Sequence, residues 1–314
     1  MQLTVNFPIR KEDFEITHLD KISLIGSCFS EEIAKKLVSN CFQIETNPFG
    51  VVFHPVLISK FLNETIENTK TERVLKKDNI LLSWDANSTI YNSVSEDAFI
   101  KDINLIRENY KSHLIQSKVL FITFGTAWGY RLIETNELVA NCHKLPARDF
   151  SKELTESAEI VSNWRKTIEL IQKINPEIKI IFTVSPVRHI KDGIIENNQS
   201  KAILIESIRQ ITKLYNCHYF PSYEIVIDEL RDYRFYKTDF VHPSEQAINY
   251  VWERFQNTYF NSETIELNKE ILLLKNMLSH RSIHAESLEN KKMQASIKKK
   301  LALFQLNHPT IILK

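Results

Sequence analysis

Glycine is scarce in this sequence. Only five glycines occur in 314 residues, whereas about 7% of the residues of a typical protein are glycine. A chain so poor in glycine is expected to keep one mainly where a side chain does not fit. The phosphate-binding patterns G-x-G-x-x-G and G-x-x-x-x-G-K-[ST] are both absent, which argues against a nucleotide cofactor.

The sequence also lacks an excess of charge of one sign and a long apolar run. The formal net charge is +1, which argues against a protein that mainly binds nucleic acid. No run of about 18 apolar residues is present, so we expect no membrane span. The first ten residues show no basic segment followed by an apolar one, so no secretion signal is predicted.

Cysteine pairs are missing as well. The four cysteines are Cys28, Cys41, Cys142 and Cys217. Because none of them forms a C-x-x-C pair, we interpret them as reduced thiols of a cytoplasmic protein. His280 and His284 stand four residues apart without an H-E-x-x-H motif. They are interpreted as a solvated helix face, and no metal or organic cofactor is expected.

Short apolar runs alternate with longer segments of helical periodicity. Buried strands are predicted at 22–25, 118–124 and 178–184, and further strands at 42–45 and 218–220. Helices are predicted from 30, at 55–68, 95–116, 154–171 and 204–214, from 223, and at 243–259. Two β-hairpins are predicted, at 79–93 and 130–141. This alternation predicts an α/β fold, a flavodoxin-like three-layer sandwich with a mostly parallel sheet.

The last part of the chain differs in character. Residues 261–314 contain no glycine and carry nine Lys or Arg against five Glu. Two helices are predicted there, at 264–280 and 285–306. We therefore expect a catalytic domain over 1–260 and a C-terminal helical extension over 261–314, which covers the core or contacts a protein partner.

Three of the five glycines follow predicted strands, where ligands bind in parallel α/β sheets. Gly26 is followed by Ser27 at a strand-to-helix junction. A serine on such a turn is a candidate nucleophile once a base removes its proton. The alternative is that Ser27 only caps the helix. Its neighbour Cys28 is interpreted as a core cysteine rather than as a thiol nucleophile.

Asp239 and His242 form a D-x-x-H pattern just before the last predicted helix of the core. An aspartate three residues before a histidine can fix the imidazole, which then takes the proton of a serine. Gly50 and Gly125 can bring the backbone close to a substrate, or they are ordinary turn glycines. His189 lines the pocket, binds a substrate anion, or belongs to an ordinary loop.

The G-S-C-F string at 26–29 resembles the signature of the GSCFA family, which is similar to the SGNH or GDSL-like serine hydrolases. The resemblance covers about residues 20–260 and includes an N-C-H-K stretch at 141–144 and an S-P-V stretch at 185–187. It implies an SGNH-hydrolase-like fold and a serine-dependent activity on esters.

The resemblance also implies roles for individual residues. Ser27 would be the nucleophile, Asp239 and His242 would complete the triad, and the Gly50 N–H would join the oxyanion hole. The third block of the superfamily reads Gly-x-Asn, whereas this chain has Ala127 at the position of the asparagine. Candidates for the missing donor are Asn141 and His143, because their loop follows soon after the strand that ends at Gly125.

These observations predict a serine-dependent acyl-ester hydrolase or O-acyltransferase that works through an acyl-enzyme. Its substrate would be a small-molecule or glycan acyl ester, with no nucleic acid and no cofactor. Two other classes are kept open: a catalytically weakened module that binds a carbohydrate or an acylated ligand, and a scaffold that acts through residues 261–314.

Overall fold

The computed structural model describes residues 5–69, 72–87, 92–93, 95–279 and 288–313. Its centre is a sheet of parallel strands. In spatial order these are β2 (Gln43–Thr46), β1 (Lys21–Gly26), β6 (Ser117–Phe124), β10 (Lys179–Val184) and β11 (Cys217–Tyr219). Numbered along the chain, the order is 2-1-3-4-5, which is the flavodoxin-like order. The predicted fold class is therefore confirmed.

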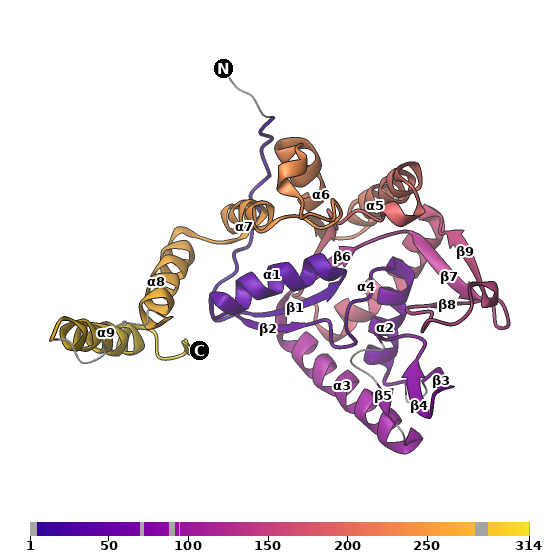
Figure 1. The fold of residues 1–314 in the computed structure, drawn as a ribbon, viewed down its shortest axis with the longest axis horizontal. Coiled ribbons are helices and arrows are strands. Elements are labelled where there is room, and N and C mark those ends of the chain that lie inside the picture. The colour runs from indigo at the N-terminus through magenta and orange to yellow at the C-terminus, as the bar shows by residue number, and fades with distance from the viewer. Residues whose placement is uncertain (1–4, 70–71, 88–91, 94, 280–287, 314) are drawn as a thin grey trace.

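Helices cover both faces of this sheet (Figure 1). They are α1 (Cys28–Ser39), α2 (Pro55–Glu67), α3 (Glu96–Gln116), α4 (Ser157–Ile174), α5 (Ile194–Leu214), α6 (Ser222–Glu224) and α7 (Glu245–Tyr259). Side chains of α2, α3, α4 and α5 form one apolar cluster with the sheet. Side chains of α1 and α7 form a second cluster on the opposite face. The sheet is thus the middle of three layers.

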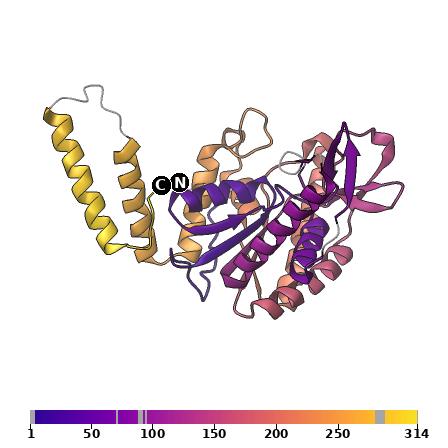
Figure 2. The ribbon, with the colours of Figure 1, turned by 90° about the horizontal axis from the view of Figure 1, so that it is seen from below.

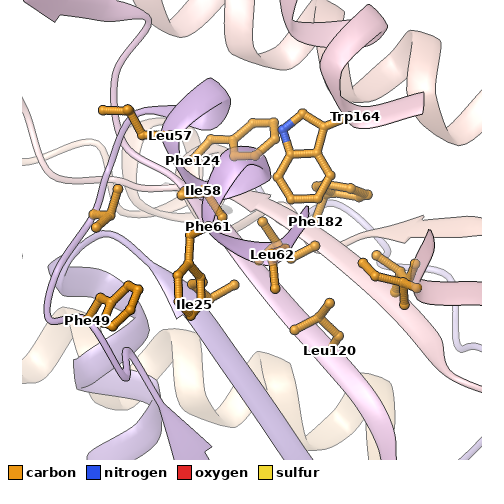
Figure 3. Close-up of a cluster of buried hydrophobic side chains, with 14 of the residues drawn as sticks. Ile25, Phe49, Leu57, Ile58, Phe61, Leu62, Leu120, Phe124, Trp164 and Phe182 are labelled. Atoms are coloured by element: carbon orange, nitrogen blue, oxygen red, sulfur yellow. The ribbon is translucent and has the colours of Figure 1, made fainter. Parts of the chain in front are cut away.

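Strand β6 shows why both faces of the sheet are covered. Its residues alternate between the two clusters, since Leu120 and Phe124 join the first and Val119 and Phe121 join the second. Figure 3 shows Trp164 of α4 close to Phe124, and the ring centroids of the two are 5.3 Å apart. A strand that is apolar on both faces is typical of a buried parallel sheet.

Two small antiparallel sheets lie outside the central one. They consist of β3 (Val74–Lys77), β4 (Ile80–Ser83) and β5 (Asn92–Ser93), and of β8 (Glu137–Val139), β7 (Trp128–Leu132) and β9 (Phe150–Leu154). The hairpin predicted at 79–93 is present as the β4–β5 pair, and the hairpin predicted at 130–141 is the β7–β8 pair. Strands β3 and β9 were not predicted, and Leu154 belongs to β9 rather than to a helix.

Three predicted helices differ from the structure, two in where they start and one in its type. Helix α5 begins at Ile194, well before residue 204. After β11 the chain forms α6 and then a π-helix, Ile225–Leu230. Pro243 precedes α7 instead of opening it, because Ser244 is the N-cap and its Oγ accepts the Ala247 N–H at 3.3 Å.

The C-terminal part contains α8 (Ser262–Ser279) and α9 (Leu288–Asn307). Both views show the two helices side by side and set apart from the central sheet (Figures 1 and 2). Their shared apolar cluster includes Ile271, Leu274 and Phe304. Within the described ranges, no helix has the length and the apolar run that crossing a bilayer would require.

Candidate active site

The turn after β1 is shaped by Gly26. Its φ is 137°, and a Cβ added there would lie 2.2 Å from the Thr123 carbonyl oxygen of β6. Its N–H donates to the Asn47 side-chain oxygen at 2.8 Å. A glycine is therefore required where β1 and β6 run side by side. The chain leaves the sheet here, between the strands at which the strand order reverses, where flavodoxin-like folds bind ligands.

Ser27 follows at the N-cap of α1. Its Oγ accepts the Phe29 N–H at 3.3 Å, and its own N–H donates to the Thr123 carbonyl at 3.1 Å. The residue is 2% exposed. The capping role left open by the sequence is thus present. The same position puts Ser27 at the positive end of the α1 dipole.

Gly125 lies next to Ser27 at the end of β6. A Cβ added to Gly125 would come within 3.3 Å of the Ser27 Cβ and within 2.5 Å of the Phe53 Cβ. Its N–H donates to the Phe53 carbonyl at 2.8 Å. Gly50, with φ of 73°, donates its N–H to the Asn47 carbonyl at 2.7 Å. In this conformation the N–H groups of Gly125 and Gly50 therefore both donate to backbone carbonyls of neighbouring turns.

Asp239 and His242 are in direct contact. The Asp239 Oδ2 lies 2.7 Å from the His242 Nδ1, while Oδ1 accepts the N–H groups of Val241 and His242 at 2.9 and 3.0 Å. These backbone hydrogen bonds, with the imidazole, hold the pKa of the Asp239 carboxyl well below its usual range. The carboxylate is therefore ionised near neutral pH and fixes the orientation of the ring.

Described contacts connect this loop with the strand ends. The Arg188 N–H donates to the Val241 carbonyl at 3.1 Å, so the loop after β10 holds the Asp239–His242 loop. The next residue, His189, has its ring 5.6 Å from the Phe53 ring, which stands beside Gly125. The contacts described for Ser27 do not include a hydrogen bond to the His242 ring. The Asp239–His242 loop and the turn that carries Ser27 thus lie at one edge of the sheet, without a described hydrogen bond between the two side chains Ser27 and His242.

Asn141 and His143 lie on the loop after β8. The Asn141 Oδ1 accepts the His143 N–H at 2.7 Å. The buried His143 ring lies against Trp84, with its Nε2 2.7 Å from the Ser83 carbonyl oxygen. The structure therefore brings these two residues to each other and to the end of β4. Ala127 is fully buried, and its N–H donates to the Ser200 Oγ at 2.7 Å.

Lys201 was not anticipated from the sequence. This fully buried lysine of α5 donates from Nζ to the Gly125 carbonyl at 2.6 Å and to the Ser185 carbonyl at 2.7 Å. It thus connects the ends of β6 and β10 beside Ser27. Burial lowers the pKa of its amine to about 7. The sequence did carry a signal, because Lys201 falls on the same helix face as the buried Leu204 and Ile208.

The other reactive groups near the site are less suited to chemistry. Cys28 is half-buried, and burial raises the pKa of its thiol, so the thiolate that attacks a carbonyl is disfavoured. In the described part of the chain, no three His, Cys, Asp or Glu side chains gather as a metal site would require. His280 and His284 lie outside the described residues.

The fold and the motifs agree on a family. The protein is a flavodoxin-like α/β protein with the G-S-C-F turn after its first strand and an Asp–His pair before α7. The model of the GSCFA family matches residues 21–255, and the chain belongs to this family. The resemblance inferred from the sequence is confirmed.

Solved structures with a similar fold include carbohydrate esterases. A carbohydrate esterase of family 3 from Talaromyces cellulolyticus is 9% identical, with a TM-score of 0.36, over 80% of this chain and 99% of the other. A family two carbohydrate esterase from Clostridium thermocellum, in complex with cellohexaose, is 11% identical, with a TM-score of 0.38, over 81% and 65%. An acetyl xylan esterase from Butyrivibrio proteoclasticus is 11% identical, with a TM-score of 0.37, over 87% and 66%. No curated protein matches the sequence. At such scores the likeness assigns no activity to this chain.

Proposed function

We propose that the protein is a serine-dependent acyl-ester hydrolase or O-acyltransferase. Ser27 is the nucleophile, His242 the base and then the acid, and Asp239 the residue that orients His242. The observation that carries the proposal is the 2.7 Å contact between the Asp239 carboxylate and the His242 Nδ1. It leaves Nε2 as the proton-accepting atom of a neutral ring.

The proposed reaction has two halves. The Ser27 Oγ attacks the ester carbonyl carbon while its proton passes to the His242 Nε2. The bond to the alcohol oxygen then breaks, and His242 returns the proton to the departing alcohol. Water or a second alcohol attacks the acyl-enzyme with the same assistance, which releases the acid or a new ester and restores Ser27. No step requires a metal or an organic cofactor.

Oxyanion binding requires a small rearrangement. The N–H groups of Ser27 and Gly50 both donate to backbone carbonyls here, and Ala127 has no side-chain amide to contribute. We propose that substrate binding draws the Ser27 and Gly50 N–H groups toward the oxyanion. Loss of one such donor costs about 10²–10³ in rate in well-studied hydrolases. Slow turnover of generic esters is therefore expected.

A fluorophosphonate probe tests this proposal, because it reacts with serines activated by a base. We expect the full-length protein to be labelled and Ser27→Ala to lose the labelling. Ser39→Ala, which removes an exposed serine at the end of α1, serves as the matched control and keeps it. Equal labelling of Ser27→Ala and the parent would remove the assignment.

The N–H groups of Ser27 and Gly50 already donate to backbone carbonyls, and Ala127 has no side-chain donor. Both observations favour a second candidate, a module of the same fold that binds a carbohydrate or acylated ligand without turning it over. This alternative predicts ligand binding that is unchanged in His242→Ala and no turnover on a panel of short- and long-chain esters. Turnover that disappears in His242→Ala would exclude it.

A further inference from the structure

A pocket of about 240 Å³ lies beyond the ends of β10 and β11. It is formed by the loop after β10, the first turn of α5, α6 with its π-helix, and the 3₁₀ helix Tyr233–Phe235. Its lining includes Arg188, Tyr223, Tyr233 and Tyr236. Sites for drug-sized ligands measure about 300–1,000 Å³. This smaller volume suits a single sugar ring better than an oligosaccharide.

Arg188 is held in place without a counter-charge. Its guanidinium lies over the ring of Tyr233, at 5.7 Å, and over that of Tyr236, at 5.5 Å. Among the described residues, no carboxylate lies within ion-pair distance of it. Cation–π contacts orient a guanidinium but leave its N–H donors available in the plane of the group. Such a fork matches the two oxygens of a carboxylate or a phosphate.

The other charges around the pocket leave a positive balance on its lining. Arg231 also lines it and has no described carboxylate partner. Asp232 lines it too, but its Oδ1 accepts the Arg234 N–H at 2.8 Å as the cap of the 3₁₀ helix. Near Tyr223, the Glu224 carboxylate accepts the Tyr219 hydroxyl. Burial, with smaller contributions from the Glu224 and Asp228 carboxylates, raises the pKa of the Tyr223 hydroxyl.

The pocket adjoins the Asp239–His242 loop. The Arg188 N–H donates to the Val241 carbonyl at 3.1 Å. The Tyr233 ring packs edge-on against Phe240 of the loop, with centroids 5.7 Å apart, and Tyr236 pairs with Pro243. A molecule in the pocket would therefore lie next to the loop that carries His242.

We propose that this pocket binds an anionic sugar through its carboxylate or phosphate, with Arg188 as the principal partner and the tyrosine rings as the walls. If the proposed function holds, this sugar is the alcohol part of the ester. The enzyme would then act on acyl esters of acidic sugars in preference to neutral ones.

Calorimetric titration of the full-length protein with glucuronate, glucose 6-phosphate and methyl glucoside tests the pocket without relying on turnover. We expect an anionic sugar to bind at least about tenfold more tightly than the neutral one, as one charge-assisted bidentate contact implies. Arg188→Gln should remove that preference, and Arg188→Lys should keep part of it. Arg148→Gln, which removes an equal charge from an exposed arginine, is the control and should keep it all.

The titrations distinguish two kinds of anionic sugar site from the absence of a site. Tighter binding of glucuronate identifies the pocket as a uronic acid site, and tighter binding of glucose 6-phosphate identifies it as a sugar phosphate site. Equal binding of neutral and anionic sugars, equal losses in Arg188→Gln and Arg148→Gln, or no binding of any probe would overturn the proposal. Failure of the fluorophosphonate probe to label Ser27 in the parent protein would refute the catalytic proposal alone, because sugar binding is measured independently of it.

Discussion

Asp239 is the residue whose environment is most clearly arranged for a single task. It accepts hydrogen bonds from two backbone N–H groups and contacts the His242 ring, although its side chain is 46% exposed. So exposed a position contributes little to the packing of the core. The two backbone hydrogen bonds hold the carboxylate in place, and its contact with Nδ1 orients the His242 ring.

We expect Asp239→Asn to lower kcat on an activated ester by roughly 10²–10⁴-fold, because an amide stabilises the wrong tautomer of the imidazole. The melting temperature should change little. Asp102→Asn, at an exposed site on α3, is the control and should leave kcat unchanged. An Asp239→Asn enzyme as fast as the parent would show that His242 is not oriented by this carboxylate.

Lys201 should make the stability of the protein depend on pH. Its folded-state pKa of about 7 lies below the ordinary lysine value of 10.5, so the unfolded chain binds more protons between these values. The free energy of unfolding therefore rises with pH across that window. Relative to Lys201→Met, the parent should gain about 2 kcal/mol between pH 7 and pH 9.

Chemical denaturation of both proteins at the two pH values measures this gain. A neutral amine still has two N–H groups for the two carbonyls it contacts, which is why the buried site accepts the uncharged form. Identical pH dependence in the parent and in Lys201→Met would mean that the buried amine does not titrate in this range.

Gly26 should tolerate no side chain. Gly26→Ala combines a positive φ with a Cβ 2.2 Å from a backbone oxygen of β6, and we expect a loss of roughly 3 kcal/mol or more in the free energy of unfolding. Gly193→Ala is the comparison, because its nearest neighbour is the flexible end of Glu196. Denaturation curves should rank Gly26→Ala as the more damaging change, and the reverse order would contradict the close approach of β1 and β6.

Among the elements, the turn from β6 to β7 holds Ala127 in a tightly bonded position. Ala127 has no exposed surface, its N–H donates to Ser200, and its carbonyl accepts the Thr155 N–H at 2.9 Å. A longer side chain at this buried position would have to displace its neighbours.

We expect Ala127→Asn to destabilise the protein by about 1–3 kcal/mol through overpacking and to leave ester turnover no faster. Ala158→Asn, at an exposed position of α4, controls for the substitution itself. A large gain in kcat for Ala127→Asn would show instead that the amide can reach the oxyanion.

The long buried elements could be predicted, and the edge elements could not. The continuous apolar run of β6 and the apolar residues at helical spacing in α4 can be recognised in the sequence. Strands β3 and β9 are edge strands with mixed polarity, V-L-K-K and F-S-K-E-L, so their pairing depends on partners distant in sequence. The donor roles of Gly50 and Gly125 depend on how each turn closes, which the sequence alone does not specify.

At the scale of the whole molecule, the candidate site lies at the carboxyl edge of the sheet, whereas α8 and α9 are set apart from the sheet (Figure 2). Their contacts with the rest of the chain include the 3.0 Å hydrogen bond from Asn268 to Gln256 of α7. We propose that residues 261–314 form an extension that is not needed for the chemistry.

A chain ending at Asn261 should therefore keep the rate of fluorophosphonate labelling, with a lower melting temperature because the contacts of α8 are lost. Circular dichroism would check that the shortened chain is folded, and labelling kinetics would compare it with the full-length protein. A folded but unlabelled truncated chain would show that the extension takes part in building the site.

The proposed function requires that one hydroxyl, at the start of α1, is activated by one imidazole, just before α7. Mass spectrometry of the peptides from probe-treated protein tests it most directly. We expect an adduct on the peptide that contains Ser27 in the parent, and none in His242→Gln. An adduct on any other residue, or an adduct on Ser27 that persists in full without the imidazole, would contradict it.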